Sequence, residues 1–165
     1  MKTVALLTSG GDSPGMNAAL RAAAKTCAAR GVRLLGVRDG YEGLIDGRMV
    51  EVVPGPCVLL GEPGLDVLGG QGGTVLGSAR SARFREATGR TRAAEAMRAA
   101  GVEGLVVIGG NGSLTGAHLL AREHGVRVMG IPASIDNDIG CTALAIGTDT
   151  ALNTIVSACD DIDDT

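Results

Sequence analysis

The sequence predicts an α/β fold with a Rossmann-like, doubly wound and mainly parallel sheet. Short apolar runs of strand length alternate along the chain with Ala-rich stretches of helical length, and this order is typical of repeated βα units. Glycine-rich polar segments follow the predicted strands, at the edge where open α/β sheets bind ligands. With 165 residues, the chain is long enough for one domain with its own core or for the larger part of a two-domain enzyme.

The first βαβ unit is predicted at the start of the chain. Ser13 and Pro14 supply an N-cap hydroxyl and a proline at the first helical position, and Gly31 is a suitable helix stop. In chain order we expect a strand over residues 4–7, a helix over 15–30 and a second strand over 32–37. This order implies parallel strands with the helix packed on one face of the sheet.

The same pattern returns in the second half, where Gly101 and Gly125 are the expected helix stops. There we expect a helix over residues 91–100, a strand over 105–108, a helix over 114–124, a strand over 126–129 and a last helix over 149–163. Residues 131–138 are predicted as a loop, because a proline and a polar cluster interrupt the pattern. Prolines and glycines also break residues 42–88 into short strands and loops.

Composition argues against several classes of protein. The formal net charge of -3 does not suit a basic nucleic-acid-binding surface. No apolar run reaches transmembrane length, and the first residues lead directly into a strand rather than a signal peptide. The four cysteines, at positions 27, 57, 141 and 159, form no Cys-x-x-Cys pair. We therefore expect reduced thiols and a cytoplasmic protein with neither nucleic acid nor membrane as a partner.

Two glycine-rich loops, residues 9–15 and 109–113, each follow a predicted strand and lead into a predicted helix. Glycines let a backbone approach a ligand closely, and the free N–H groups at a helix N-terminus attract anions. The first loop alone is equally consistent with a tight turn, but two such loops in one sheet favour phosphate binding. Ser113 can cap the helix that follows it, donate a hydrogen bond to a phosphate, or do both.

The third loop carries the residues suited to chemistry. Ser134, Asp136 and Asp138 alternate along a segment that we expect to be extended, so their side chains can share one side. One carboxylate beside a substrate hydroxyl can accept its proton, and a second can hold Mg²⁺ directly or through water. The alternative is a solvated turn with aspartates as local caps. The apolar Ile135 and Ile139 favour a loop that is pinned against the core.

Arg80 stands in a glycine-rich stretch with two further arginines close by. It is either a solvated surface arginine or a group that neutralises the charge that develops on a transferring phosphoryl group.

Six blocks of the sequence together resemble the 6-phosphofructokinase family. They occur in the family's order and spread over almost the whole chain, at residues 8–18, 39–44, 73–80, 108–113, 130–138 and 146–153. The resemblance implies a phosphofructokinase-type N-terminal domain. It also implies Mg²⁺-dependent transfer of the γ-phosphoryl group of ATP to the 1-hydroxyl of fructose 6-phosphate, a step of glycolysis.

The resemblance also implies a set of site residues. Those expected to bind the nucleotide are Gly11, Tyr41, Arg80, Ser81, Gly110, Asn111, Gly112 and Ser113. Those expected to bind the sugar phosphate are Ser134, Ile135 and Asp136. Asp136 is the implied general base, Ser134 contacts the transferred group, and Arg80 completes the catalytic set. Asn111 and Asp138 are the implied Mg²⁺ ligands.

Two positions near these residues bear on the donor and the metal. A small residue such as Gly112 is associated in the family with ATP, and an aspartate there with pyrophosphate. Asn111 stands where the family usually has an aspartate, so we expect weaker metal binding or a larger share for Asp138. Ser134 replaces the usual threonine and retains a hydroxyl group.

The family continues for about as long again beyond the length of this chain. We therefore expect residues 1–138 to form a nucleotide-binding domain and residues 139–165 to begin the sugar-phosphate domain. The alternative function is a non-catalytic or regulatory relative, or a fragment, that binds nucleotide or sugar phosphate. A lipid or NAD kinase is a third alternative, disfavoured by the first loop and by residues 135–138.

The bacterial members of the family are allosteric tetramers, so the resemblance implies a homo-oligomer with effectors such as ADP or phosphoenolpyruvate. Arg21 and Lys25 match two basic effector positions and lie one turn apart on the predicted helix. Asp163 stands where a further arginine is expected. We therefore expect a weak or altered response to these effectors.

Overall fold

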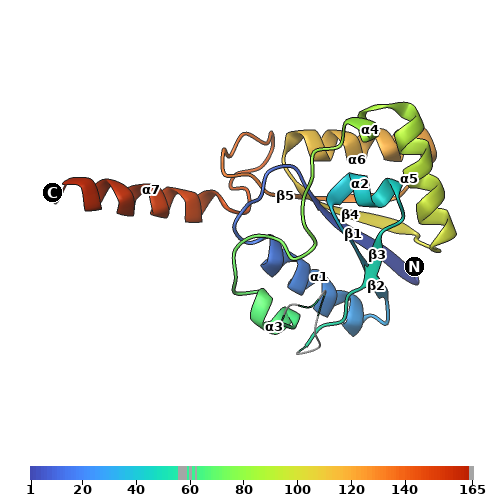
Figure 1. The fold of residues 1–165 in the computed structure, drawn as a ribbon, viewed down its shortest axis with the longest axis horizontal. Coiled ribbons are helices and arrows are strands. Elements are labelled where there is room, and N and C mark those ends of the chain that lie inside the picture. The colour runs from blue at the N-terminus through green and yellow to red at the C-terminus, as the bar shows by residue number, and fades with distance from the viewer. Residues whose placement is uncertain (56–58, 60, 62, 164–165) are drawn as a thin grey trace.

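The structure is a five-stranded, mainly parallel α/β sheet with helices on both faces (Figure 1). It is a computed structural model that describes residues 1–55, 59, 61 and 63–163, and Cys57 lies outside them. The strand order is β3-β2-β1-β4-β5, and only β3 is antiparallel to its neighbour. The strands are β1 (Thr3–Ser9), β2 (Arg33–Val37), β3 (Met49–Glu51), β4 (Gly104–Gly109) and β5 (Val128–Pro132). The predicted fold class is confirmed.

Two separate hydrophobic clusters cover the two faces of the sheet. Ala5 and Leu7 of β1 point into one cluster, whereas Val4 and Leu6 point into the other, because neighbouring side chains of a strand alternate between its faces. The helices on the first face are α2 (Gly40–Ile45), α4 (Ala82–Arg85), α5 (Ala87–Ala99) and α6 (Asn111–His124). Those on the second face are α1 (Met16–Ala29) and α3 (Leu65–Leu68).

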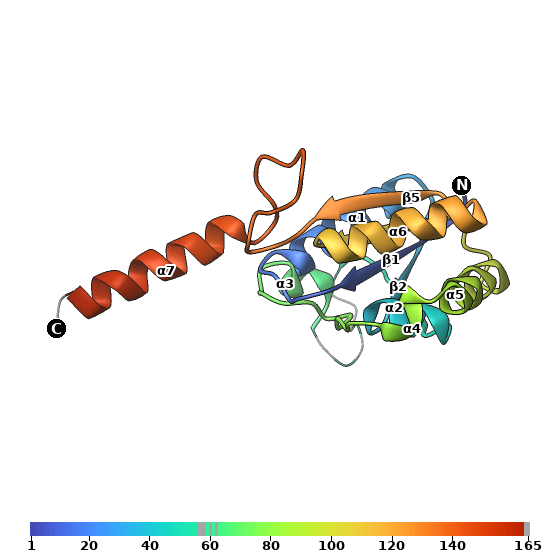
Figure 2. The ribbon, with the colours of Figure 1, turned by 90° about the horizontal axis from the view of Figure 1, so that it is seen from above.

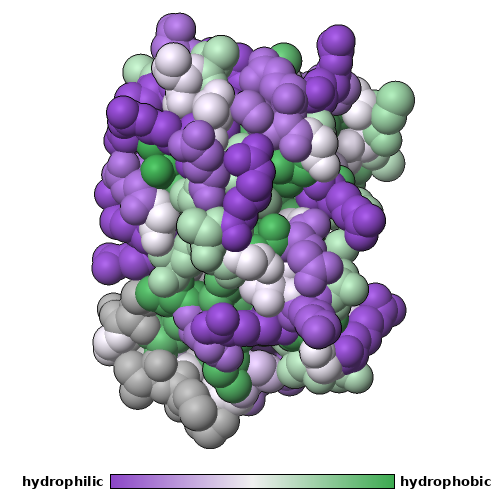
Figure 3. Space-filling view, turned by 90° about the vertical axis from the view of Figure 1, so that its right-hand side faces the viewer, coloured by the Kyte–Doolittle hydropathy of each residue, from purple (hydrophilic) through white to green (hydrophobic). Residues whose placement is uncertain are grey.

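The last helix, α7 (Thr148–Asp163), extends away from this body (Figure 2). Hydrophilic side chains dominate the opposite end of the molecule, with hydrophobic residues in patches between them (Figure 3). Among the described residues, no helix has both the length and the apolar content that a membrane span needs.

The start of α1 differs from the prediction. The helix begins at Met16, and its N-cap is Gly15, whose φ of 95° lies in the left-handed region. The Ser13 hydroxyl does not cap the helix but donates to the backbone oxygen of Ile146 at 2.7 Å. The expected cap is therefore wrong, because a contact with a distant segment takes the hydroxyl that a local cap would use.

Other helix and strand boundaries also differ from the predicted ones. The helix α6 begins at Asn111 with Gly110 as its N-cap, so Ser113 lies within the first turn and is not the cap. The strand β5 follows the register of β4, in which Gly109 pairs with Pro132. Residues 131 and 132 are therefore strand rather than loop, and β5 starts two residues later than expected. The predicted stops at Gly31, Gly101 and Gly125 are confirmed by their positive φ angles.

The middle of the chain contains more helix than predicted. Three short helices, α2, α3 and α4, occur within or at the edge of the segment expected to hold strands and loops, together with the strand β3. Each helix has only four to six residues, too few for helical periodicity to be visible in the sequence. Buried side chains such as Leu44 and Leu65 hold them against the sheet.

Replacing Gly43 with alanine tests the tight packing of α2. An added Cβ would lie 1.6 Å from the backbone oxygen of Arg38, so the backbone must shift. We expect the free energy of unfolding to fall by at least about 2 kcal/mol in denaturant titrations. Gly140→Ala is the matched control, since its Cβ meets nothing within 4 Å; a change there within about 0.5 kcal/mol is expected. Equal stability of both variants would contradict this packing.

Candidate functional site

A cavity of about 720 Å³ opens beside the carboxyl ends of β1, β4 and β5. It forms there because these strands are adjacent and parallel, so the segments that follow them meet at one edge of the sheet. The residues predicted for nucleotide, sugar and metal all line it: Gly11, Tyr41, Arg80, Ser81, Gly110, Asn111, Gly112, Ser113, Ser134, Ile135, Asp136 and Asp138. The three predicted loops therefore share one site.

Glycines allow the first loop and the start of α6 to lie against each other. A Cβ on Gly109 would lie 2.5 Å from the backbone oxygen of Ser9 and 2.8 Å from the Cβ of Ser113. Gly10, with a φ of 94°, faces the Ser113 hydroxyl. The first-turn amides of a helix have no partner within the helix and carry partial positive charge. The start of α6 can therefore hold an anion in this cavity.

The third loop is a turn, and the expected extended segment is wrong. The Ser134 hydroxyl accepts from the backbone N–H of Asp136 at 3.2 Å and donates to Asp138 Oδ1 at 3.3 Å. Asn137 between the two aspartates has a φ of 50°. The turn, rather than strand alternation, brings Ser134, Asp136 and Asp138 together. Ile139 is buried as expected, but Ile135 is 51% exposed and is not pinned against the core.

The two predicted metal ligands contact each other directly. The Asn111 amide nitrogen donates to the Asp138 carboxylate at 2.9 Å and to the Asp138 backbone oxygen at 3.1 Å. In the described part of the chain, no three Asp, Glu, His or Cys side chains gather closely enough to hold a metal ion. The site therefore offers an amide and a carboxylate rather than a full set of protein ligands.

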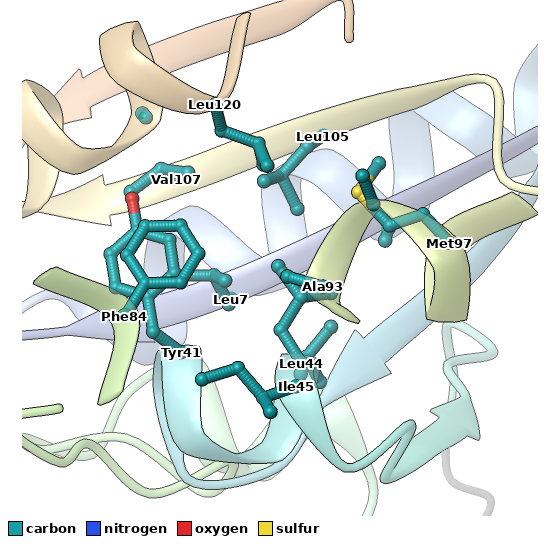
Figure 4. Packing of buried hydrophobic residues seen from close by; sticks show 14 residues of the cluster. Leu7, Tyr41, Leu44, Ile45, Phe84, Ala93, Met97, Leu105, Val107 and Leu120 are labelled. Atoms are coloured by element: carbon teal, nitrogen blue, oxygen red, sulfur yellow. The ribbon is translucent and has the colours of Figure 1, made fainter. Parts of the chain in front are cut away.

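One wall of the cavity is a pair of stacked rings, Tyr41 and Phe84, with centroids 3.8 Å apart (Figure 4). The Tyr41 hydroxyl donates to the backbone oxygen of Ser113 at 2.6 Å, and burial raises the pKa of Tyr41. A Cβ on Gly116 of α6 would lie 3.1 Å from the Phe84 ring. Sequence reasoning missed Phe84 and Gly116; the sequence signal was a pair of glycines, 112 and 116, one turn apart on a helix.

Arg80 is exposed at the rim of the cavity, which is compatible with both interpretations of this residue. The Ser81 hydroxyl already has two protein partners. It accepts from the backbone N–H of Phe84 at 3.0 Å, as the N-cap of α4, and it donates to Glu42 at 2.5 Å. Ser81 therefore shapes the wall as well as lining it.

Arg90 also lines the cavity, and sequence reasoning missed it. It is 7% exposed and binds both carboxylate oxygens of Glu123, at 2.6 and 2.8 Å. It also donates to the backbone oxygens of Phe84 and Arg85. The Glu123 hydrogen bonds raise the pKa of Arg90. Arg90 thus joins α5 and α6 to the end of α4. No local sequence pattern predicts this role.

The predicted effector residues lie outside the cavity. Arg21 and Lys25 both pair with Asp66 of α3, at 3.0 and 3.2 Å, so they do share one face of α1. Their hydrogen bonds hold the pKa of Asp66 below its ordinary value. Both cations already have a protein partner, and their effector role stays a prediction.

Comparison with known proteins identifies the family. The family model described as "Phosphofructokinase" matches residues 3–165. The chain belongs to this family. It is 50% identical to the ATP-dependent 6-phosphofructokinase of Thermotoga neapolitana and 51% identical to that of Brevibacillus brevis, over all 165 residues in both cases. These residues cover 49% of each relative, so this phosphofructokinase-family chain spans about half the length of the curated relatives it matches.

A solved structure agrees with this assignment. The T-state crystal structure of Pichia pastoris phosphofructokinase superposes with a TM-score of 0.89 at 37% sequence identity. The match covers 99% of this chain and 18% of the Pichia chain. The likeness therefore extends over the body, the cavity and the last helix of this phosphofructokinase-family chain.

The Arg90–Glu123 pair predicts how stability depends on pH. Hydrogen bonding to Arg90 holds the pKa of Glu123 below its ordinary value. The pair therefore stabilises the fold above the unfolded-state pKa, about 4.3 for glutamate, and this contribution is lost as pH falls through the lowered pKa. Glu123→Gln is expected to lower the free energy of unfolding at neutral pH. It is also expected to reduce the further loss of stability as the pH falls. Urea titrations at several pH values measure this. Glu95→Gln, at an exposed position of α5, is the control, and its free energy of unfolding is expected to depend on pH as in the wild type. The same pH dependence in Glu123→Gln would contradict the prediction.

Proposed function

We propose that the protein transfers the γ-phosphoryl group of ATP to the 1-hydroxyl of fructose 6-phosphate, giving fructose 1,6-bisphosphate. One observation carries this proposal: the turn that bears Asp136 lies in the same cavity as the glycine loop and the N-terminus of α6. An anion-binding helix start beside a carboxylate suits phosphoryl transfer to a hydroxyl, because the reaction needs phosphate positioning and a proton acceptor. The names of the curated relatives support the choice of donor and acceptor.

Each proposed role follows from a position in the cavity. The amides at the start of α6, with Gly11, receive the nucleotide phosphates, and the Tyr41–Phe84 wall bounds the nucleotide. Asp136 accepts the proton of the attacking sugar hydroxyl. Ser134 and Ile135, in the same turn, contact the sugar phosphate and the transferred group. Arg80 at the rim neutralises the charge that develops during transfer.

The donor set suits Mg²⁺ that is held mainly by nucleotide phosphates. Mg²⁺ is usually bound through one or two carboxylates together with substrate phosphates and water. Asp138 supplies a carboxylate and Asn111 an amide oxygen once its amide turns from the present contact with Asp138. When bound, the ion neutralises charge on the phosphates. A less charged protein site agrees with the weaker metal binding expected from Asn111.

The Asn111–Asp138 contact also favours a second candidate, a relative that binds nucleotide without catalysing transfer. A neutral amide that already occupies Asp138 stabilises the turn without any ion. The kinase assay with Mg²⁺ described below separates the two candidates, since a binding protein would show no turnover.

The same proposal covers the location, the assembly, the effectors and the domain division of the protein. The protein acts in the cytoplasm as a homo-oligomer, a tetramer as in bacterial members of the family, with an altered response to ADP or phosphoenolpyruvate through Arg21 and Lys25. Residues 1–138 form the nucleotide-binding domain and residues 139–165 begin the sugar-phosphate domain. The path of α7, which leaves the body and exposes Leu152 and Val156, supports a second domain that begins in this region, while residues 139–147 remain hydrogen-bonded to the body.

Replacing Asp136 with serine tests the proton acceptor. In protein expressed from its complete gene, we expect turnover with ATP, fructose 6-phosphate and Mg²⁺ to fall by about 10²- to 10⁴-fold. The nucleotide dissociation constant, measured by calorimetry, is expected to stay within about threefold, because Asp136 is assigned to the sugar side. Glu95→Ser, outside the cavity, is the control. Wild-type turnover in the Asp136 variant would remove the assigned base.

Gly112 tests the choice of phosphoryl donor. A Cβ at this position would meet nothing within 4 Å, so the space over it is open to a nucleotide. We expect wild-type protein to use ATP in preference to pyrophosphate, and Gly112→Asp to lose activity with ATP by about 10-fold or more, since a carboxylate would crowd and repel the nucleotide phosphates. Rates with both donors measure the effect, and a preference of the wild type for pyrophosphate would contradict it.

A further inference from the structure

Asn137 lies between the two carboxylates of the turn, and its backbone has a φ of 50°. Left-handed backbone is strained for most side chains, and asparagine is among the few residues that tolerate it. In the described chain, the other non-glycine residues with positive φ are Asp39 and Cys141. Asn137 lies between Asp136 and Asp138, so its left-handed backbone affects the direction in which each carboxylate leaves the turn.

Both the oxygen and the nitrogen of the Asn137 side-chain amide form hydrogen bonds. Its oxygen accepts from the backbone N–H of Ala145 at 2.9 Å and from the Thr148 hydroxyl at 3.5 Å, and its nitrogen donates to the backbone oxygen of Ala143 at 3.2 Å. The two backbone partners belong to residues 139–147, which leave the turn and return to it. One side chain therefore ties the middle of the turn to a separate segment.

That segment is itself held to the body of the domain. The backbone N–H of Ile146 donates to the oxygen of Pro132 at 3.0 Å, and the oxygen of Ile146 accepts from Ser134 N–H at 3.1 Å and from the Ser13 hydroxyl at 2.7 Å. Thr148, only 4% exposed, donates to the backbone oxygen of Ser134 at 2.9 Å. The amide of Asn137 thus connects the turn to an anchored support.

We infer that Asn137 is a positioning residue for phosphoryl transfer, and this inference rests on the proposed function. Asn137 does not line the cavity, whereas Asp136 and Asp138 on either side of it do. It therefore acts through its neighbours: the left-handed backbone and the three hydrogen bonds of its side-chain amide hold both carboxylates in place. A misplacement of about 1 Å at a reacting group can cost about 10²-fold in rate.

Three variants separate the backbone from the amide. Asn137→Gly retains the left-handed backbone and removes the three side-chain hydrogen bonds. Asn137→Ala removes the same bonds and also strains the backbone. Asn137→Asp retains an acceptor for Ala145 N–H, but it cannot donate to Ala143 and it adds a charge between two aspartates. Thr91→Ala is the control, because it removes a side-chain to backbone hydrogen bond of 3.0 Å on α5, outside the cavity.

In protein from the complete gene, we expect kcat to fall about 10-fold in Asn137→Gly and about 100-fold in Asn137→Ala. The KM for ATP and the nucleotide dissociation constant are expected to stay within about threefold of wild type, since the nucleotide contacts remain. Wild-type kcat in Asn137→Ala would overturn the inference. A parallel loss of nucleotide binding in all three variants would also overturn it, because it would indicate general damage to the fold.

Hydrogen exchange of the Ala145 amide separates this inference from the proposed function. We expect that exchange to be faster than wild type in Asn137→Gly and Asn137→Ala, and protected in Asn137→Asp, whose carboxylate still accepts the bond. A wild-type protein without transferase activity would overturn the proposed function while the exchange pattern still tested the contact. Equal exchange in all the proteins would overturn the positioning role whatever the activity.

Discussion

The geometry of the site follows from the backbone packing at the carboxyl ends of β1 and β4, where Gly109 pairs with Ser9. At Gly109 a Cβ would lie 2.5 Å from the backbone oxygen of Ser9 and 2.8 Å from the Cβ of Ser113, so a side chain at this position would clash with both β1 and α6. Because Gly109 has no side chain, the first loop can lie directly against the first turn of α6. The same register places the end of β5 next to β4, with Pro132 opposite Gly109. The three segments that line the cavity therefore meet as a consequence of backbone packing.

That packing brings opposite electrostatic features into one space. The start of α6 presents amide N–H groups and the positive end of a helix dipole, whereas the turn presents the carboxylates of Asp136 and Asp138. The cavity therefore holds hydrogen-bond donors and carboxylates side by side. Asn111 joins the two sides, since it belongs to α6 and donates to Asp138. Its neutral amide lets the two sides approach without repulsion between like charges.

Side chains that link separate elements hold this arrangement together. Arg90 connects α5, α6 and the end of α4 through Glu123 and two backbone oxygens. Tyr41 joins α2 to α6 through the backbone of Ser113, and its ring stacks on Phe84. Asn137 performs a similar task for the turn. In each case one side chain joins segments that are separate in the chain, so the shape of the cavity depends on contacts between segments.

The α/β class, the positions of most strands and helices, and the loops that line the cavity could be predicted from the amino-acid sequence, because alternating apolar runs, glycine stops and polar strand ends are local features. The sequence also singled out Asp136 and Asp138 as neighbours in one loop. The folded chain was needed to show that this loop is a turn, that the Ser13 hydroxyl binds Ile146 rather than capping α1, and that Arg90 shapes the wall. The Ser13 and Arg90–Glu123 contacts join groups 133 and 33 residues apart, and such distant partners compete with the local hydrogen bonds that sequence patterns describe.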